Sequence, residues 1–207
     1  MKFKPVSRLY TIFSLFFIIS ILLLISSCDT AKPFLKTAEP PLQVVEQNGV
    51  QVECLYLNYN DMEKRHGWKA NPFLPPDLGL TPQQMIVFEL KITNKENAPV
   101  VLSLKNIELF FGDKRFIPLS GRDMEAKIDD FADEKTDKLK ENSIAQEFML
   151  PGLTTIKDNR TQKGYLVFMG AFRGKDIPTE LFLSFTTPDK KTAADITFNY
   201  TLTLIKK

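Results

Sequence analysis

The sequence predicts a mainly β protein built as an antiparallel β-sandwich, with one short, charged helical insertion. Several segments alternate apolar and polar residues, which is the period of a strand with one buried and one solvated face. Turn-forming residues separate these segments, and phenylalanine accounts for 17 of the 207 residues. Phenylalanine fills the space between two sheets without needing a polar partner, so the signals together favour two packed sheets.

The strands follow from the clearest alternations. At residues 85–94, apolar residues fall on one face, with Glu89 and Lys91 on the other. Asn48 and Gly49 favour a two-residue hairpin turn, because both residues tolerate positive φ angles. The expected strands are 44–46, 50–57, 85–94, 100–104, 107–111, 115–119, 144–150, 164–169, 180–185 and 196–205.

Residues 122–142 differ from this pattern, because 13 of the 21 are charged. The apolar residues within the segment fall near one helical stripe: Met124, Ile128, Phe131 and Leu139. We expect one or two short helices laid over the sandwich. The acidic residues lack the glycine and the alternating oxygen ligands of a calcium loop, so no metal is expected there.

The first 27 residues contain three basic and no acidic residues, an apolar run at 9–25, and two serines before Cys28. A basic start, an apolar stretch and small residues before a cleavage point are typical of a secretory signal. A cysteine directly after those residues resembles the lipobox of bacterial lipoproteins, which are cleaved before the cysteine and lipidated on it. The alternative is an uncleaved membrane anchor, since a run of about 17 residues is near the lower limit for crossing a bilayer.

These features divide the chain into a signal peptide at 1–27, a lipidated Cys28 with a proline-rich tether at 28–43, and one sandwich domain at 44–207. Removing the signal leaves 24 basic and 25 acidic residues, a net charge near −1. This balance gives no electrostatic case for binding nucleic acid and predicts no basic patch for anionic lipids. Membrane attachment is therefore expected through acyl chains on Cys28.

Cys54 has no partner in the chain if Cys28 carries lipid, and a disulfide between the two is the alternative. Its alternation with Val52 and Tyr56 predicts a place on the inner face of a strand. A buried thiol behaves as a small apolar side chain, so we expect a structural role.

Residues 58–84 form a long segment without a clear period, and such a loop in a compact domain is often functional. It contains the single histidine, His66, together with Trp68 and Phe73. Exposed aromatic side chains anchor protein partners, so these three are the candidate partner-binding residues. The alternative is that Trp68 and Phe73 pack over an open edge of the sandwich.

The sequence contains no recognised catalytic or metal-binding motif. A single histidine gives no zinc-ligand spacing, and no serine lies in a G-x-S-x-G sequence. We expect no enzyme, no cofactor and no metal. A hydrolase that uses acids of the 58–84 loop is the weaker alternative.

A family resemblance rests on four segments: Phe88-Glu-Leu-Lys-Ile-Thr-Asn94, Ile107-Glu-Leu-Phe-Phe-Gly112, Leu150-Pro-Gly152 and Gly164-Tyr-Leu-Val-Phe168. This order of strands and corners resembles the immunoglobulin-like domains of bacterial secreted lipoproteins, such as the DUF4352 or telokin-like group. The resemblance covers roughly 50–185, and the chain departs from it at 58–84 and 122–142. It implies an immunoglobulin-like sandwich and carries over no catalytic residue.

Together these features predict a non-catalytic, membrane-anchored lipoprotein of the cell envelope that binds a protein partner or supports an envelope assembly. The alternative is a carrier or sensor for a small or apolar ligand, motivated by the many phenylalanines. The domain is expected outside the cytoplasm, on the cell membrane or the outer membrane. Asp29 follows the cysteine, and in enteric bacteria an aspartate there resembles the signal that keeps lipoproteins in the inner membrane.

Overall fold

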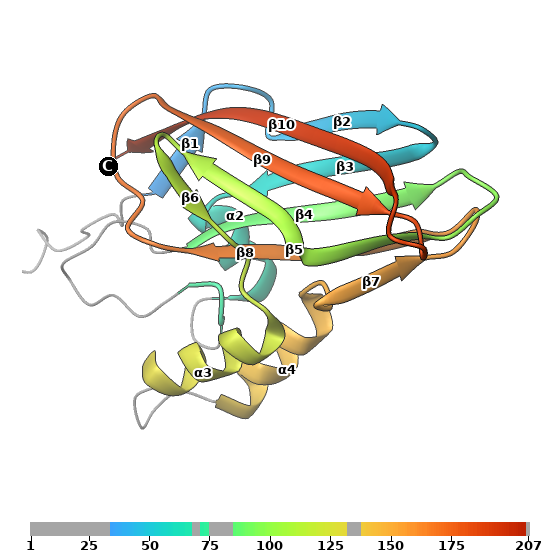
Figure 1. Ribbon diagram of the computed structural model, residues 1–207. Helices are drawn as coiled ribbons and strands as arrows, with labels where there is room; N and C mark the ends of the chain where they lie inside the picture. Colours follow the sequence, from blue (N-terminus) through green and yellow to red (C-terminus); the bar gives the residue numbers. More distant parts are fainter. Residues whose placement is uncertain (1–33, 68–70, 75–84, 132–137, 206–207) are drawn as a thin grey trace, which may run out of the picture. The chain divides into compact units, whose positions relative to one another are not determined.

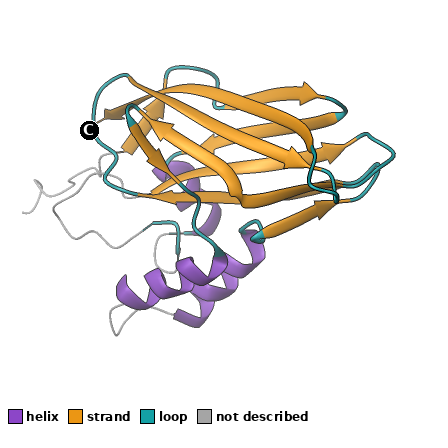
Figure 2. Cartoon of the chain, in the orientation of Figure 1, coloured by secondary structure: helices purple, strands orange, loops and turns teal. Residues whose placement is uncertain are grey.

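The computed structural model describes residues 34–67, 71–74, 85–131 and 138–205. Within these residues the chain forms ten strands and three helices, and the strands make two antiparallel sheets (Figure 1, Figure 2). The prediction of a mainly β, antiparallel sandwich with a helical insertion is confirmed. Cys28, Asp29 and the signal peptide lie outside the described residues.

The larger sheet has six strands in the order β1-β10-β9-β5-β6, with β7 also paired to β5. These strands are β1 (Phe34–Thr37), β5 (Val100–Phe111), β6 (Lys114–Phe116), β7 (Leu153–Ile156), β9 (Ile177–Thr186) and β10 (Thr192–Ile205). The predicted strands 100–104 and 107–111 are thus one strand, β5. Its pairing with β9 shifts register between Leu102 and Ile107, which explains the break in the apolar alternation.

The smaller sheet has four strands in the order β2-β3-β4-β8. They are β2 (Leu42–Gln47), β3 (Val50–Leu57), β4 (Met85–Asn94) and β8 (Thr161–Met169). The predicted hairpin turn joins β2 to β3, with φ angles of 47° at Asn48 and 70° at Gly49. A Cβ at Gly49 would also approach the Glu96 Oε1 atom to 2.2 Å, so only glycine fits this turn.

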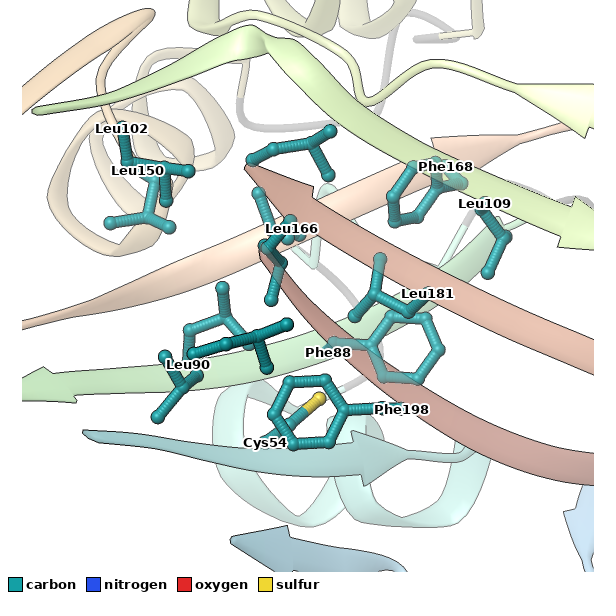
Figure 3. Close-up of a cluster of buried hydrophobic side chains, with 14 of the residues drawn as sticks. Cys54, Phe88, Leu90, Leu102, Leu109, Leu150, Leu166, Phe168, Leu181 and Phe198 are labelled. Carbon is teal, nitrogen blue, oxygen red and sulfur yellow. The ribbon is translucent and has the colours of Figure 1, made fainter. Parts of the chain in front are cut away.

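The main core lies between the two sheets. Alternate residues of β3, β4, β8, β9 and β10 point into it and are fully buried, including Cys54 (Figure 3). Aromatic rings pack across the gap, since Tyr200 of one sheet lies 5.5 Å from Phe88 of the other, measured between ring centroids. The expected inward place of Cys54 is confirmed, and its thiol is free.

A second apolar cluster lies on the outer face of the smaller sheet, where three helices cover it. The helices are α2 (Tyr59–His66), α3 (Gly121–Phe131) and α4 (Lys138–Phe148). Met62 of α2, Met124 and Ile128 of α3, and Ala145 of α4 are buried against sheet residues such as Val87. The predicted helices over the sandwich are confirmed, although Leu139 points to solvent with 84% of its surface exposed.

The prediction of a strand at 144–150 is wrong, because α4 continues to Phe148. Ile144 and Phe148 are four residues apart, as are Ala145 and Met149, and all four contribute to the second cluster. A spacing of four places side chains on one helical face. The segment then ends in an isolated parallel bridge between Met149 and Tyr165.

The prediction of an irregular tether at 28–43 is wrong for residues 34–37 and 42–43, which are strands β1 and β2. β1 pairs with β10, with Phe34 opposite Ile205. A four-residue strand has no sequence period of its own, and its partner lies about 170 residues away along the chain. This long-range pairing stabilises it, together with the burial of Leu35 in the main core and a hydrogen bond of 3.0 Å from the Tyr56 hydroxyl to the Leu35 carbonyl.

The prediction of a loop at 58–84 is wrong for residues 59–66, which form α2. Asn58 and Asp61 form a reciprocal capping box, in which each side chain accepts a hydrogen bond from the other's backbone N–H. Gly67 ends the helix with a positive φ of 75°, and its N–H donates to the Glu63 carbonyl at 2.8 Å. The helix carries Arg65 and His66 to the edge of the smaller sheet.

Candidate functional site

The structure places the three candidate partner-binding residues differently. Trp68 lies outside the described residues. Phe73 belongs to the second apolar cluster and is only 2% exposed, so the prediction that it anchors a partner is wrong. Phe73 instead has the packing role that the alternative gave it, between α2 and the sheet. His66 is half-buried and remains at the surface.

His66 sits in an aromatic cluster. Its ring lies 4.7 Å from that of Phe148, 5.8 Å from Tyr165 and 5.6 Å from Phe73, measured between centroids. Phe148 stacks on Tyr165 at 5.5 Å. Rings packed this closely hold one another in fixed rotamers, so the cluster forms a rigid wall.

This wall borders a surface groove of about 500 Å³ between α2, α4 and strands β4 and β8. We call it the α2–β8 groove, and its lining residues are Arg65, His66, Glu89, Glu147, Phe148, Lys163, Gly164 and Tyr165. It therefore combines a rigid aromatic wall with charges of both signs.

Glu89 is the charged centre of the groove. Its side chain is only 12% exposed and forms ion pairs with Arg65 and with Lys163, whose Nζ atom lies 3.1 Å from Oε1. Lys163 is 60% exposed and Arg65 35%, so both cations remain open to water and to a ligand. Both cations are engaged by the same carboxylate, so a ligand here would join an existing ion-pair network.

The Tyr165 hydroxyl joins the charged and aromatic sides. Its oxygen accepts a hydrogen bond from Arg65 Nη1 at 3.2 Å and lies 3.3 Å from His66 Nε2. Since that oxygen already accepts from Arg65, its O–H can donate to Nε2 of a neutral His66 protonated on Nδ1. Burial lowers the pKa of His66, and the nearby charge of Arg65 lowers it further, against an opposing effect of Glu147. His66 is therefore neutral at neutral pH.

Sequence reasoning found only His66 of this groove. The sequence placed Glu89 on a solvated strand face and Tyr165 in an apolar run, and it gave Lys163 no role, since the predicted strand began at residue 164. One signal was present: Glu89 shares its strand face with the apolar residues Met85 and Val87. A carboxylate on a partly apolar face indicates that something covers part of that face, and here it is the helices.

Among the acids of the 58–84 segment, Asp61 has a structural role. The Asp61 carboxylate accepts from the Asn58 N–H at 3.1 Å and so caps α2. Asp77 lies outside the described residues. In the part of the chain that the structure describes, no three His, Cys, Asp or Glu side chains gather as metal ligands.

Cys54 is a structural thiol. Burial raises its pKa to about 12. The Tyr200 hydroxyl donates to the backbone carbonyl of Cys54 at 3.2 Å. A thiol that remains protonated and enclosed is neither a nucleophile nor a metal ligand at neutral pH.

A second, smaller groove of about 250 Å³ lies on the outer face of the larger sheet. Its acidic residue Glu39 is engaged within the fold, because it accepts hydrogen bonds from the Thr201 N–H at 2.6 Å and the Thr201 hydroxyl at 2.7 Å. These contacts fasten the segment after β1 to β10. The α2–β8 groove is the larger of the two and holds the freer charges.

Comparisons with known proteins give no family. No protein-family model matches the chain, and no curated protein matches its sequence. Among solved structures, the chain is similar to the candidate lipoprotein ycdA from Bacillus subtilis, with 15% identity and a TM-score of 0.40 over 79% of this chain. The match spans 39% of the length of that Bacillus chain.

A protein of unknown function from Listeria monocytogenes is also similar, with 12% identity and a TM-score of 0.37. That match covers 81% of this chain and 86% of the other. Among the described residues, no helix is long and apolar enough to cross a membrane.

Proposed function

We propose that this chain is a non-catalytic lipoprotein of the bacterial cell envelope, anchored by acyl chains on Cys28, whose sandwich domain binds a protein partner at the α2–β8 groove. The observation that carries the binding site is the composition of the groove, in which Arg65, Phe148 and Tyr165 surround the half-enclosed Glu89. Arginine and aromatic residues are the types that contribute most binding energy at protein interfaces.

The rigidity of the groove supports the same proposal. His66, Phe148 and Tyr165 are held by ring packing, and Arg65 is held by Glu89 and by the Tyr165 hydroxyl. A preordered surface loses little side-chain entropy on binding, so a partner segment gains more from each contact. Lys163 and the exposed Glu147 both line the groove and offer a charge of each sign to that segment.

The anchor rests on the leader sequence that ends at Cys28. Cys28→Ser is expected to abolish labelling with a radioactive fatty acid and to abolish cleavage of the precursor. The measurement is labelling of cells followed by gel analysis. A variant that is still cleaved normally and labelled would refute the lipid anchor.

Partner binding is tested with a photo-crosslinking amino acid at Glu147, on the rim of the groove. In cells, a discrete crosslinked species is expected, and its yield falls several-fold when Lys163→Glu reverses one rim charge. Lys190→Glu makes the same charge change at an exposed turn far from the groove and serves as the matched control. Equal yields from Lys163→Glu and the unchanged protein would contradict binding at this groove.

A small polar ligand is the second candidate for the same groove, because about 500 Å³ is within the size range of small-molecule sites. The charges in the lining favour a polar ligand over an apolar one. An apolar ligand between the sheets has no support, since the side chains there are fully buried against one another. Native mass spectrometry of protein purified from membranes separates the two candidates, because a bound small molecule adds its mass.

A further inference from the structure

The attachment point of the domain limits how it sits on a membrane. This step rests on the proposed anchor at Cys28. Phe34, the first described residue, opens strand β1 only six residues after Cys28. Six residues span at most about 22 Å even when fully extended. The end of the sandwich at which Phe34 enters therefore stays within about 22 Å of the lipidated residue.

Three other segments meet at that end. Ile205 pairs with Phe34, and the Leu204 N–H donates to the Gly174 carbonyl at 2.9 Å, which places the loop at 170–176 beside them. The Gly112 N–H donates to the Pro178 carbonyl at 2.8 Å, which adds the β5–β6 turn (Figure 1). We call this set the entry end; it comprises residues 34–36, 112–114, 170–176 and Ile205.

The entry end is positively charged. It exposes four basic side chains, Lys36, Lys114, Arg173 and Lys175. Its two exposed acidic residues are Asp113 and Asp176, and the Asp176 carboxylate already accepts from the Thr203 hydroxyl at 2.7 Å. No ion pair joins any of the four basic residues to another residue that the structure describes.

The opposite end of the sandwich has nearly balanced charge. There, Lys95 pairs with Glu46 at 2.6 Å and Lys191 with Asp189 at 3.1 Å. The exposed charged residues of its turns are Glu46, Lys95, Glu96, Lys157, Asp158, Arg160, Asp189, Lys190 and Lys191. After these pairs, the opposite end keeps three basic and two acidic residues, a net charge of +1, against +2 from four basic and two acidic residues at the entry end. The excess of unpaired positive charge is therefore one charge larger at the end that the chain's own connectivity holds near the anchor.

We propose that the entry end faces the bilayer and that Lys36, Lys114, Arg173 and Lys175 contact the headgroups of anionic phospholipids. Each basic residue close to an anionic surface strengthens attachment about fivefold, an effect that fades within a Debye length of about 8 Å. The sequence predicted no basic patch because these residues are up to 139 positions apart, and the fold gathers them. The surface orients the anchored domain and leaves its far end away from the membrane.

The test measures which end lies near lipid. Acylated protein purified from membranes is reconstituted into phosphatidylcholine vesicles, with or without phosphatidylglycerol. A donor dye is attached at Ala171→Cys in the entry end or at Asn97→Cys at the far end, both exposed and uncharged positions. Energy transfer to an acceptor on lipid headgroups then reports the distance of each end from the bilayer.

Strong transfer from position 171 and weak transfer from position 97 is expected, because the 14 residues of β10 alone span roughly 45 Å. Transfer from position 171 should rise when phosphatidylglycerol is present, and the double variant Arg173→Glu, Lys175→Glu should lose that rise. The double variant Lys190→Glu, Lys191→Glu makes the same charge change at the far end. It should still show the rise in transfer from position 171 when phosphatidylglycerol is present. Equal transfer from both ends, or a rise that survives Arg173→Glu, Lys175→Glu, overturns the proposal.

Mass spectrometry of the N-terminal peptide shows whether Cys28 carries acyl chains, and so tests the proposed anchor separately from the proposed orientation. Acyl mass on Cys28 together with equal transfer from both ends refutes only the orientation. An N-terminal peptide without acyl mass refutes the anchor itself, and with it the orientation.

Discussion

Gly164 shows how a single absent side chain positions a neighbour. A Cβ at this position would lie 2.9 Å from Leu150 Cγ and 3.2 Å from the Leu150 backbone nitrogen. The close approach lets the Leu150 N–H donate to the Tyr165 carbonyl at 3.0 Å, which fixes the chain after α4 against β8.

Gly164→Ala is expected to destabilise the domain by about 1–3 kcal/mol, since the added methyl group must displace Leu150 from a packed site. Urea unfolding followed by tryptophan fluorescence measures the change. Gly152→Ala is the matched control, because a Cβ there meets nothing within 4 Å. Equal stability of the two variants would show that Leu150 moves without cost.

The pH dependence of His66 is a second prediction at this scale. Burial and the Arg65 charge lower the pKa of His66 from its ordinary value of about 6.5. Between the lowered pKa and 6.5, the unfolded state binds more protons than the folded state. This contribution to stability is therefore complete above about pH 6.5 and is lost as the pH falls through the lowered pKa.

The measurement compares the free energy of unfolding at about pH 7.5 and about pH 5 for the natural protein and for His66→Gln, a variant that cannot titrate in this range. The natural protein should lose more stability between the two values. Because His66 is the single histidine of the chain, its NMR titration gives the pKa without an assignment problem. A pKa above 6.5 would contradict the contacts described for its ring.

Among the elements, α2 has the most direct bearing on the groove, because it supplies Arg65 and His66. Asn58→Ala removes the side chain that accepts from the Asp61 N–H at 3.2 Å, and it should cost about 0.5–2 kcal/mol. Amide hydrogen exchange in α2 should accelerate in this variant. Asn58→Asp keeps an acceptor at the cap and should leave exchange nearly unchanged.

The sequence predicted elements well where a period is local. The alternation at 85–94 and at 196–205 identified β4 and the end of β10, because an inward-facing strand residue repeats every second position. It failed for β1, which has only four residues. It also failed for α4. Ile144–Leu150 is a short apolar-rich run, and such a run does not distinguish a strand from a buried helix. The spacing of four residues became evident only once the structure showed which of its side chains pack on the sheet.

At the scale of the whole molecule, Asn94 joins the two sheets. It ends β4 of the smaller sheet, and its Nδ2 donates to the carbonyls of Ile156 at 3.2 Å and Lys157 at 3.3 Å, at the end of β7 in the larger sheet. The same amide donates to the Ala98 carbonyl at 2.8 Å, and its oxygen accepts from the Glu96 N–H at 3.0 Å. The side chain is fully buried.

Asn94→Ala should cost on the order of 1–3 kcal/mol, because it removes a fully buried amide and the hydrogen bonds that it makes, among them the buried one to the Ile156 carbonyl. The free energy of unfolding in urea measures the loss. The exposed neighbour Asn97→Ala should change it by no more than about 0.5 kcal/mol. If Asn94→Ala lowered the free energy of unfolding as little as Asn97→Ala, water would have replaced the hydrogen bonds of the Asn94 amide.

The sequence by itself determined the β-sandwich, the inward place of Cys54 and the hairpin at Asn48 and Gly49, because local periods and turn chemistry encode these features. Only the tertiary structure decided which residues line the α2–β8 groove and the entry end. Arg65, Glu89 and Lys163 come from a helix and two strands, and the basic residues of the entry end come from strands and loops on both halves of the chain. Long-range pairing brings such residues together, and the spacing of residues along the chain does not show which distant segments will pair.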